Sequence, residues 1–343
     1  MAKNLIARTA VFAAATLAGL APVGATAGRV PVAASPHTAG CPAAGWRVAA
    51  TIPVGGFPFG VAVNTRTDMI YAAYYATGQA GSVSVIDGRT RTEVATVAVG
   101  PQPYGVAVNP ATDTVYVTNG DGTVSVINGQ TNTVTATIQV SGRPYGIWAD
   151  RLTNRIYLAV NGTVVVINGQ TNKVIDRITV AVQDAFWLAL DSRTNTLYAT
   201  NELGLKVEVI NLNTDQVTAS IQLPKAPYGI AMDPKTDQAY VVVAGKGLFV
   251  IDGQTNTVTA KISIPDAFGV AADAATGQAF VANPNENTVT VVNGRDHAVA
   301  GSVPVGRQPF IGLAADPHRG IVYVTNEFGD SVSVLAQCQP SGG

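Results

Sequence analysis

A short phrase of turn residues, an aromatic residue and an apolar stretch occurs seven times along this chain of 343 residues. Its aromatic members are Phe59, Tyr104, Tyr145, Phe186, Tyr228, Phe268 and Phe310. They are separated by 45, 41, 41, 42, 40 and 42 residues. A period near 40 residues with several short strands in each copy is typical of repeat architectures. The interval therefore constrains the fold more than the length does, which by itself would suggest two domains.

The second copy of the repeat predicts four strands, over residues 104–108, 114–118, 123–127 and 133–140. Val, Thr, Tyr and Ile fill these stretches, and Asn, Asp, Gly and Pro separate them, as strands and hairpin turns require. Four antiparallel strands make one blade of a β-propeller. We therefore predict an all-β protein, a seven-bladed β-propeller of four-stranded antiparallel blades.

The last copy stops after its third predicted strand, residues 331–335. A stretch typical of a fourth strand occurs at the other end of the chain, where residues 47–54 match residues 216–223. We expect this N-terminal strand to complete the last blade and close the ring, because an open edge would pair with other chains. The predicted propeller covers residues 46–338, and residues 339–343 form a C-terminal tail.

The first 27 residues have the features of a secretory signal peptide. A basic start precedes an apolar run over residues 9–20, and Ala25-Thr26-Ala27 offers a cleavage site. The run is shorter than the roughly 20 apolar residues of a membrane helix. We expect a mature chain that begins near Gly28 with a Pro- and Ala-rich leader over residues 28–45. The protein is then secreted, and attachment to the cell surface stays open.

The charge balance argues against a polyanionic partner. The chain has 21 basic and 22 acidic residues, and residues 1–27 hold two of the basic ones and none of the acidic ones, so cleavage moves the net charge from −1 to −3. Nucleic acids and anionic membranes are bound by positive surfaces. We therefore predict no nucleic-acid partner and no membrane insertion, and we expect a monomer.

Two cysteines flank the predicted closure, Cys41 before the N-terminal strand and Cys338 after the last third strand. Every other blade joins its third and fourth strands through a hairpin, which the last blade cannot have. A Cys41–Cys338 disulfide would supply this connection in an oxidising compartment. The alternative is a pair of unlinked buried thiols.

The predicted second strands share a motif that reads Val-Tyr-Val-Thr-Asn at residues 115–119 and 322–326. Variants of it occur at residues 197–201 and 279–283. In this motif the chain resembles the YVTN family of β-propeller repeat proteins over residues 46–337. Blades one and five depart from the pattern, because Tyr74 and Val243 stand in place of its Asn. The resemblance implies a seven-bladed ring in an exported, surface-layer-like protein, but no single activity.

Few residues are placed for catalysis. His37 precedes the predicted ring, and His297 and His318 stand in predicted hairpin turns. The sequence contains no HExxH, CxxC, EF-hand or phosphate-loop motif. We therefore predict no catalytic residue, no cofactor and no metal motif. A Ca²⁺ site assembled from several blades stays open, because its ligands need not be close in sequence.

We expect any binding site at one mouth of the channel, where the loops before each first strand meet the loops between second and third strands. The position two residues before each aromatic is the least repetitive in the phrase, and it holds Phe57, Gln102, Arg143, Asp184, Ala226, Asp266 and Gln308. Neighbouring loops add Asn201, Glu202, Asn283, Glu286, Asn326 and Glu327, and Tyr74 and Tyr75 begin the longest of them. Trp187 stands where most blades have Gly.

The candidate ligand-binding residues are Arg143, Asp184, Trp187, Asp266, Gln102, Gln308, Glu202 and Glu327. The alternative is that these loop residues are simply solvated. The residues favour an exported, non-enzymatic binding scaffold whose partner is a protein, a glycan or a small molecule. The second hypothesis is a lactonase- or lyase-type enzyme with a metal at the mouth. The third is a quinoprotein-like redox partner, for which no cofactor-binding residue is identified.

Overall fold

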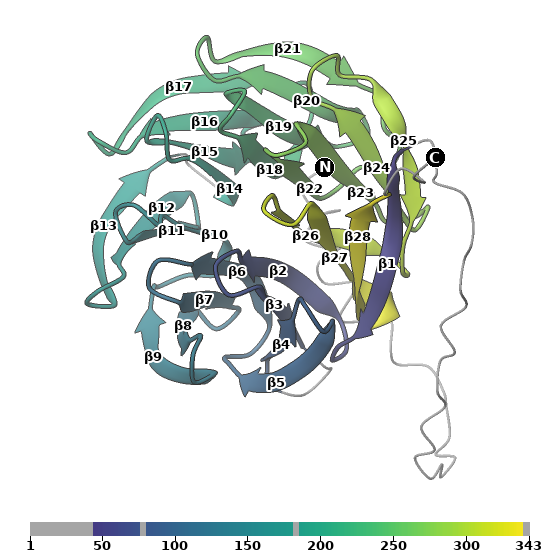
Figure 1. The fold of residues 1–343 in the computed structure, drawn as a ribbon. Coiled ribbons are helices and arrows are strands. Elements are labelled where there is room, and N and C mark those ends of the chain that lie inside the picture. The colour runs from purple at the N-terminus through teal and green to yellow at the C-terminus, as the bar shows by residue number, and fades with distance from the viewer. Residues whose placement is uncertain (1–43, 76–79, 181–184, 339–343) are drawn as a thin grey trace, which may run out of the picture. The chain divides into compact units, whose positions relative to one another are not determined.

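A computed structural model describes residues 44–75, 80–180 and 185–338 of the protein. Their strands form seven four-stranded antiparallel sheets arranged in a ring (Figure 1). The predicted seven-bladed β-propeller is therefore confirmed. The one helical segment among these residues is the 3₁₀ turn η1 (Glu327–Gly329). In this part of the chain, no helix has the length and apolar character needed to cross a bilayer.

The blades are numbered in chain order, and the first strand of each lies innermost (Figure 1). Blade 1 contains β2 (Pro58–Asn64), β3 (Met69–Tyr74), β4 (Ser82–Asp87) and β5 (Thr92–Ala98). Blade 2 contains β6 (Pro103–Asn109), β7 (Thr114–Asn119), β8 (Thr123–Asn128) and β9 (Thr133–Gln139). Blade 3 contains β10 (Pro144–Ala149), β11 (Arg155–Val160), β12 (Thr163–Asn168) and β13 (Lys173–Thr179). Blade 4 contains β14 (Ala185–Asp191), β15 (Thr196–Asn201), β16 (Lys206–Asn211) and β17 (Gln216–Gln222).

Three further blades complete the ring. Blade 5 contains β18 (Pro227–Asp233), β19 (Gln238–Val243), β20 (Gly247–Asp252) and β21 (Thr257–Ile262). Blade 6 contains β22 (Val270–Asp273), β23 (Gln278–Asn283), β24 (Thr288–Asn293) and β25 (Val299–Pro304). Blade 7 contains β26 (Pro309–Asp316), β27 (Ile321–Asn326), β28 (Ser331–Gln337) and, from the other end of the chain, β1 (Trp46–Pro53).

The apolar content of the strands follows their depth in the blade. The second and third strands are buried on both faces, as in β7 and β8, because a neighbouring blade covers each face. The outermost strands expose most of their residues, as in β9. The core therefore consists of the layers between blades, and each layer is built from two adjacent sheets.

The repeated glycine and threonine have one common role, which is contact with the next blade. A Cβ atom on Gly105 would lie 2.4 Å from the carbonyl oxygen of Tyr145, so a larger residue would separate blades 2 and 3. The Thr118 hydroxyl donates a hydrogen bond of 2.9 Å to that same carbonyl. Thr325 makes the equivalent bond to the Phe59 carbonyl, at 2.8 Å, across the ring closure. These contacts explain why both residue types recur at the repeat interval.

The predicted closure by the N-terminal strand is confirmed. β1 pairs antiparallel with β28 from Trp46 opposite Gln337 to Pro53 opposite Ser331. Trp46 is 1% exposed, and its indole Nε1 donates a 2.8 Å hydrogen bond to Gln278 Oε1 in blade 6. Its ring meets Phe280 edge-on, with centroids 4.7 Å apart. β1 is therefore fixed to blade 6 as well as to blade 7.

Several sequence predictions lie outside the described residues. The signal peptide, the leader up to residue 43, Cys41 and the tail from residue 339 are among them. The backbone of Cys338 is described, and its N–H donates a 2.9 Å bond to the Gly45 carbonyl. The pairing of β1 with β28 thus continues to Cys338, and the Cys41–Cys338 disulfide stays a prediction.

Candidate functional site

A cluster of aromatic rings lies at the centre of the propeller, where the first strands begin. Six aromatic residues of the repeat meet in a continuous series of ring contacts around the ring of blades, with centroids 3.8–5.9 Å apart. They are Tyr145, Tyr104, Phe59, Phe310, Phe268 and Tyr228. These six residues and Trp187 are called the central aromatic cluster below.

Trp187 connects this cluster across its middle. Its ring stacks on Phe59 with a centroid separation of 6.4 Å. Trp187 belongs to blade 4 and Phe59 to blade 1, which are not neighbours, so the contact crosses the centre of the ring. Trp187 also packs against the apolar layer between blades 4 and 5. The residue that the sequence places at the channel mouth therefore also fills the centre of the propeller.

The loops before the first strands have an unusual backbone. Phe57, Gln102, Asp266 and Gln308 all have φ between 48° and 54°, in the left-handed region. Only glycine adopts this region without a steric cost, and such residues gather at functional sites. Two of the loops are held by side chains of the preceding blade, since Asp330 Oδ1 accepts the Phe57 N–H at 3.1 Å and Asn287 Oδ1 accepts the Gln308 N–H at 2.7 Å. These bonds join the loop before a first strand to the loop between the second and third strands of the blade before it.

Two predicted site residues interact directly. The Arg143 guanidinium donates from Nη2 to Gln102 Oε1 at 2.8 Å, and its Cζ lies 5.6 Å from the centre of the Tyr104 ring. The loops of blades 2 and 3 therefore hold one cation against the face of an aromatic ring.

A second group of mouth residues lies between blades 7 and 1, and is called the Phe57 group below. The Phe57 ring stacks on Tyr75 at a centroid separation of 6.0 Å and meets Phe328 edge-on at 5.6 Å. Phe328 belongs to η1, next to Glu327. Glu327 is only 5% exposed, and its Oε2 meets no hydrogen-bond donor among the described residues. The group thus combines three aromatic rings with one buried carboxyl.

The electrostatics of this group depend on burial. Burial raises the pKa of Glu327 from its usual 4.5 to about 7. Burial also raises the pKa of Tyr75 to about 12, with a further contribution from the Glu327 carboxylate, and Arg143 opposes this rise. The Tyr75 phenol therefore lies close enough to interact electrostatically with both Glu327 and Arg143.

The other predicted mouth residues are spread over the remaining blades. Asp184 lies outside the described residues. Asp266 is exposed and Gln308 is half-buried, whereas Glu202 is buried in the loop between β15 and β16. Asn283 and Asn326 point into their own hairpins, where each amide donates to two hydroxyls of the following strand, at 2.6–3.1 Å. These two asparagines therefore stabilise the blades and are not part of the mouth surface.

Sequence reasoning missed Phe328 and the way in which it meets Phe57 and Tyr75. The signal was present, because Phe328 is an aromatic residue in a loop where the equivalent positions hold Asp121 and Leu203. Its partners are far apart in sequence, however, and only the ring closure brings blade 7 next to blade 1.

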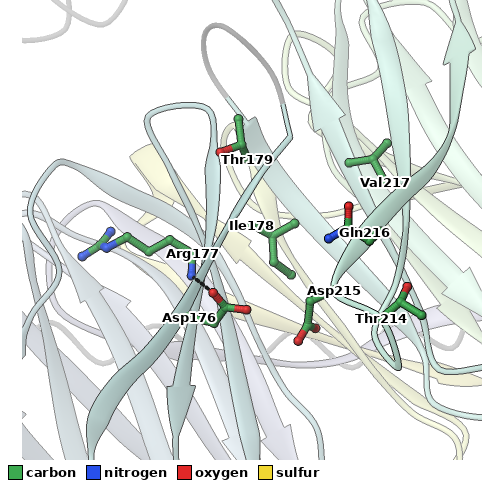
Figure 2. A pocket seen from close by; sticks show the side chains of 8 residues that line it. All are labelled: Asp176, Arg177, Ile178, Thr179, Thr214, Asp215, Gln216 and Val217. Atoms are coloured by element: carbon green, nitrogen blue, oxygen red, sulfur yellow. Dashed lines mark hydrogen bonds between the residues drawn. The ribbon is translucent and has the colours of Figure 1, made fainter.

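A groove of about 510 Å³ lies elsewhere, between the outer parts of blades 3 and 4 (Figure 2). It is lined by residues 176–179 of β13 and residues 214–217 around the start of β17. The Arg177 side chain points away from the other labelled residues (Figure 2). Its Nη2 donates to the Val140 carbonyl at 2.9 Å. Asp176 and Asp215 are its acidic residues, and Arg155 lies 3.9 Å from Asp215. No sequence pattern predicted this groove.

His297 and His318 lie in hairpin turns, as the sequence predicts. The His318 N–H bonds to Asp316 Oδ1 at 3.1 Å within its turn. In the described part of the chain, no three His, Cys, Asp or Glu side chains gather closely enough to hold one metal ion.

Comparison with known proteins supports the fold. A solved structure, a chain of hydrazine synthase from Kuenenia stuttgartiensis, superimposes with a TM-score of 0.73 at 19% sequence identity. The match covers 83% of this chain and 96% of that one. At this identity the likeness shows a shared propeller fold and nothing of the activity. No family model and no curated protein matches the chain, so the resemblance to the YVTN family stays a prediction.

Proposed function

We propose that this protein is an exported, non-enzymatic β-propeller that binds a ligand at the mouth formed by the loops of blades 1, 2, 3 and 7. The observation that carries the proposal is the asymmetry of this mouth. The strands repeat one pattern because each blade packs on two similar neighbours. The mouth loops differ from blade to blade, and they present the Arg143–Gln102 pair at blades 2 and 3 and the Phe57 group between blades 7 and 1.

The chemistry of the mouth is that of a binding surface. Aromatic rings with a few polar groups are the common lining of ligand sites. The left-handed backbone at Phe57 and Gln102 costs about 1–2 kcal/mol per residue, which is a cost that binding sites often carry. Export, the YVTN relationship and the disulfide are parts of the same proposal, and peptide mapping without reduction would detect a Cys41–Cys338 link directly.

A ligand search followed by mutation tests the proposal. Small molecules, oligosaccharides and peptides are screened for a rise in the melting temperature of the purified protein. Each ligand found is then titrated against Arg143→Ala, Phe57→Ala, His318→Ala and Thr214→Ala.

We expect Arg143→Ala or Phe57→Ala to weaken binding at least fivefold. His318→Ala, in a turn between first and second strands, and Thr214→Ala, at the outer groove, are the controls and should bind as the unchanged protein does. Equal binding by all four variants would place the function away from the mouth.

A further inference from the structure

The Phe57 group contains a buried acid without a compensating charge. Glu327 is at the start of η1, directly after β27, and its N–H donates a 3.0 Å hydrogen bond to the Gln308 carbonyl. Its Oε2 is shielded from solvent and receives no hydrogen bond from the described residues. An ionised carboxylate in such surroundings is costly unless an opposite charge or several donors accompany it. The described part of the chain itself leaves this requirement open.

The neighbouring rings favour one sign of charge. Phe57 contacts both Tyr75 and Phe328, Phe328 follows Glu327 in η1, and the Tyr75 phenol lies within reach of the Glu327 charge. The faces of aromatic rings attract cations. An anion would be repelled by the carboxylate, and an apolar ligand would leave it unpaired. A cation already lies on an aromatic face in the same mouth, because the Arg143 guanidinium lies over the ring of Tyr104. Arg143 is also bound to Gln102, and the Tyr75 phenol lies within reach of its charge.

We propose that the Phe57 group is a binding site for an organic ammonium ion, which Phe57, Tyr75 and Phe328 contact through their rings and Glu327 neutralises. This inference rests on the proposed function, and it names the chemical class of the ligand. The alkyl groups of such an ion bury apolar area on the rings, while its charge supplies the counter-ion that the carboxyl lacks.

The site should respond to pH. Burial holds the pKa of Glu327 at about 7, so a cation has to displace a proton below this pH. The other charged and titratable groups that the structure places near the site are Tyr75, Tyr104, Arg143 and Asp330. Burial raises the pKa of both tyrosines, that of Tyr75 to about 12, and arginine keeps its charge, so these three groups do not change near neutrality. Asp330, which accepts the Phe57 N–H, is tested by Asp330→Asn, whose amide oxygen can accept the same bond.

Calorimetric titration of the full chain tests the inference. The probes are choline and n-butylammonium, with 3,3-dimethylbutan-1-ol as the neutral isostere of choline. We expect at least one ammonium probe to bind ten times or more tightly than the neutral isostere. Between about pH 8 and about pH 6, its affinity should fall about tenfold, since a group with a pKa near 7 changes its ionised fraction by that factor.

Matched variants separate charge from shape. Glu327→Gln keeps the size of the side chain and should remove both the preference for ammonium and the pH step. Phe57→Leu keeps an apolar side chain without a ring face and should weaken ammonium binding at least fivefold, with a smaller effect on the neutral isostere. Asp330→Asn should keep the pH step, and His318→Ala, away from the site, should bind as the unchanged protein does and keep it as well.

Each contrary result has its own meaning. If neither ammonium probe binds, or if the neutral isostere binds as tightly and Phe57→Leu weakens both alike, the ammonium inference is wrong, while the mouth can still bind other ligands. If choline binds to Glu327→Gln and to Phe57→Leu as tightly as to the unchanged protein, the cation site lies elsewhere. This result would count against the proposed function as well.

Discussion

At the scale of single residues, the mouth combines features that a stable core avoids. Glu327 is a buried carboxyl, and Phe57 has a left-handed backbone in spite of its bulky side chain. Both lower the stability of the folded chain, and both belong to the same group of side chains. Natural proteins carry such costs mostly at functional sites.

Glu327→Gln should stabilise the protein, and more strongly at higher pH. The pKa of Glu327 is higher in the folded chain than in the unfolded chain, so the folded state binds more protons between 4.5 and about 7, and stability falls as the pH rises through this window. Above pH 7 the penalty reaches at most on the order of 3 kcal/mol, and below about pH 4.5 it vanishes.

Denaturant unfolding of both proteins at about pH 5 and about pH 8 measures this effect. The gain in unfolding free energy from Glu327→Gln should be larger at the higher pH. Asp266→Asn, at an exposed mouth position, is the control and should show little change at either pH. A variant that is less stable than the parent at the higher pH would show that the carboxylate is stabilised by its surroundings.

At the scale of elements, β1 differs from all other outer strands. An outer strand such as β9 exposes most of its residues and is joined to its blade by a hairpin. β1 lacks the hairpin, and Trp46 supplies a packed anchor on blade 6. The strand that lacks a covalent connection to its neighbour is therefore the one that begins with a buried tryptophan.

Trp46→Ala should lower the unfolding free energy by about 3–5 kcal/mol, the usual cost of deleting a large buried side chain. Trp46→Phe keeps most of the packing on Phe280 but loses the bond to Gln278, so a smaller loss of about 1–2 kcal/mol is expected. Thermal unfolding of the three proteins measures both losses.

Deletion of residues 41–54 should expose the edge of β28 and cause aggregation, which light scattering would detect. A truncated protein that stays monomeric and equally stable would contradict the role of β1.

At the scale of the whole molecule, two tryptophans break the symmetry of the innermost strands. Trp187 replaces a glycine and reaches Phe59 across the ring, whereas Trp148 replaces an alanine of most other blades and is 37% exposed. Trp187 therefore connects two blades that are not neighbours, whereas Trp148 lies partly exposed on its own blade.

Trp187→Ala and Trp148→Ala should differ in their effect. The first should cost about 2 kcal/mol, because it removes ring contacts from the central aromatic cluster, and the second less than about 1 kcal/mol. Denaturant unfolding followed by tyrosine fluorescence compares the two variants. Equal losses would mean that the contact across the ring contributes no stability.

The sequence by itself determined the number of blades, their strands and the closure of the ring. These features follow from local rules that repeat along the chain, namely strand propensity, turn residues and, in most blades, a glycine at the close approach to the next blade. The sequence also predicted that the loops before the first strands lie beside the loops between second and third strands, because antiparallel connectivity places alternate loops on the same side of a propeller.

Only the tertiary structure decided which mouth residues meet. Phe57 and Phe328 are 271 positions apart and become neighbours because the ring closes between blades 7 and 1. The burial of Glu327 depends on the loops around it, and the position of Trp187 depends on a blade on the other side of the ring. The repeats specify the local geometry of each blade. The contacts between blades 7 and 1 and those across the centre of the ring depend on the arrangement of all seven blades.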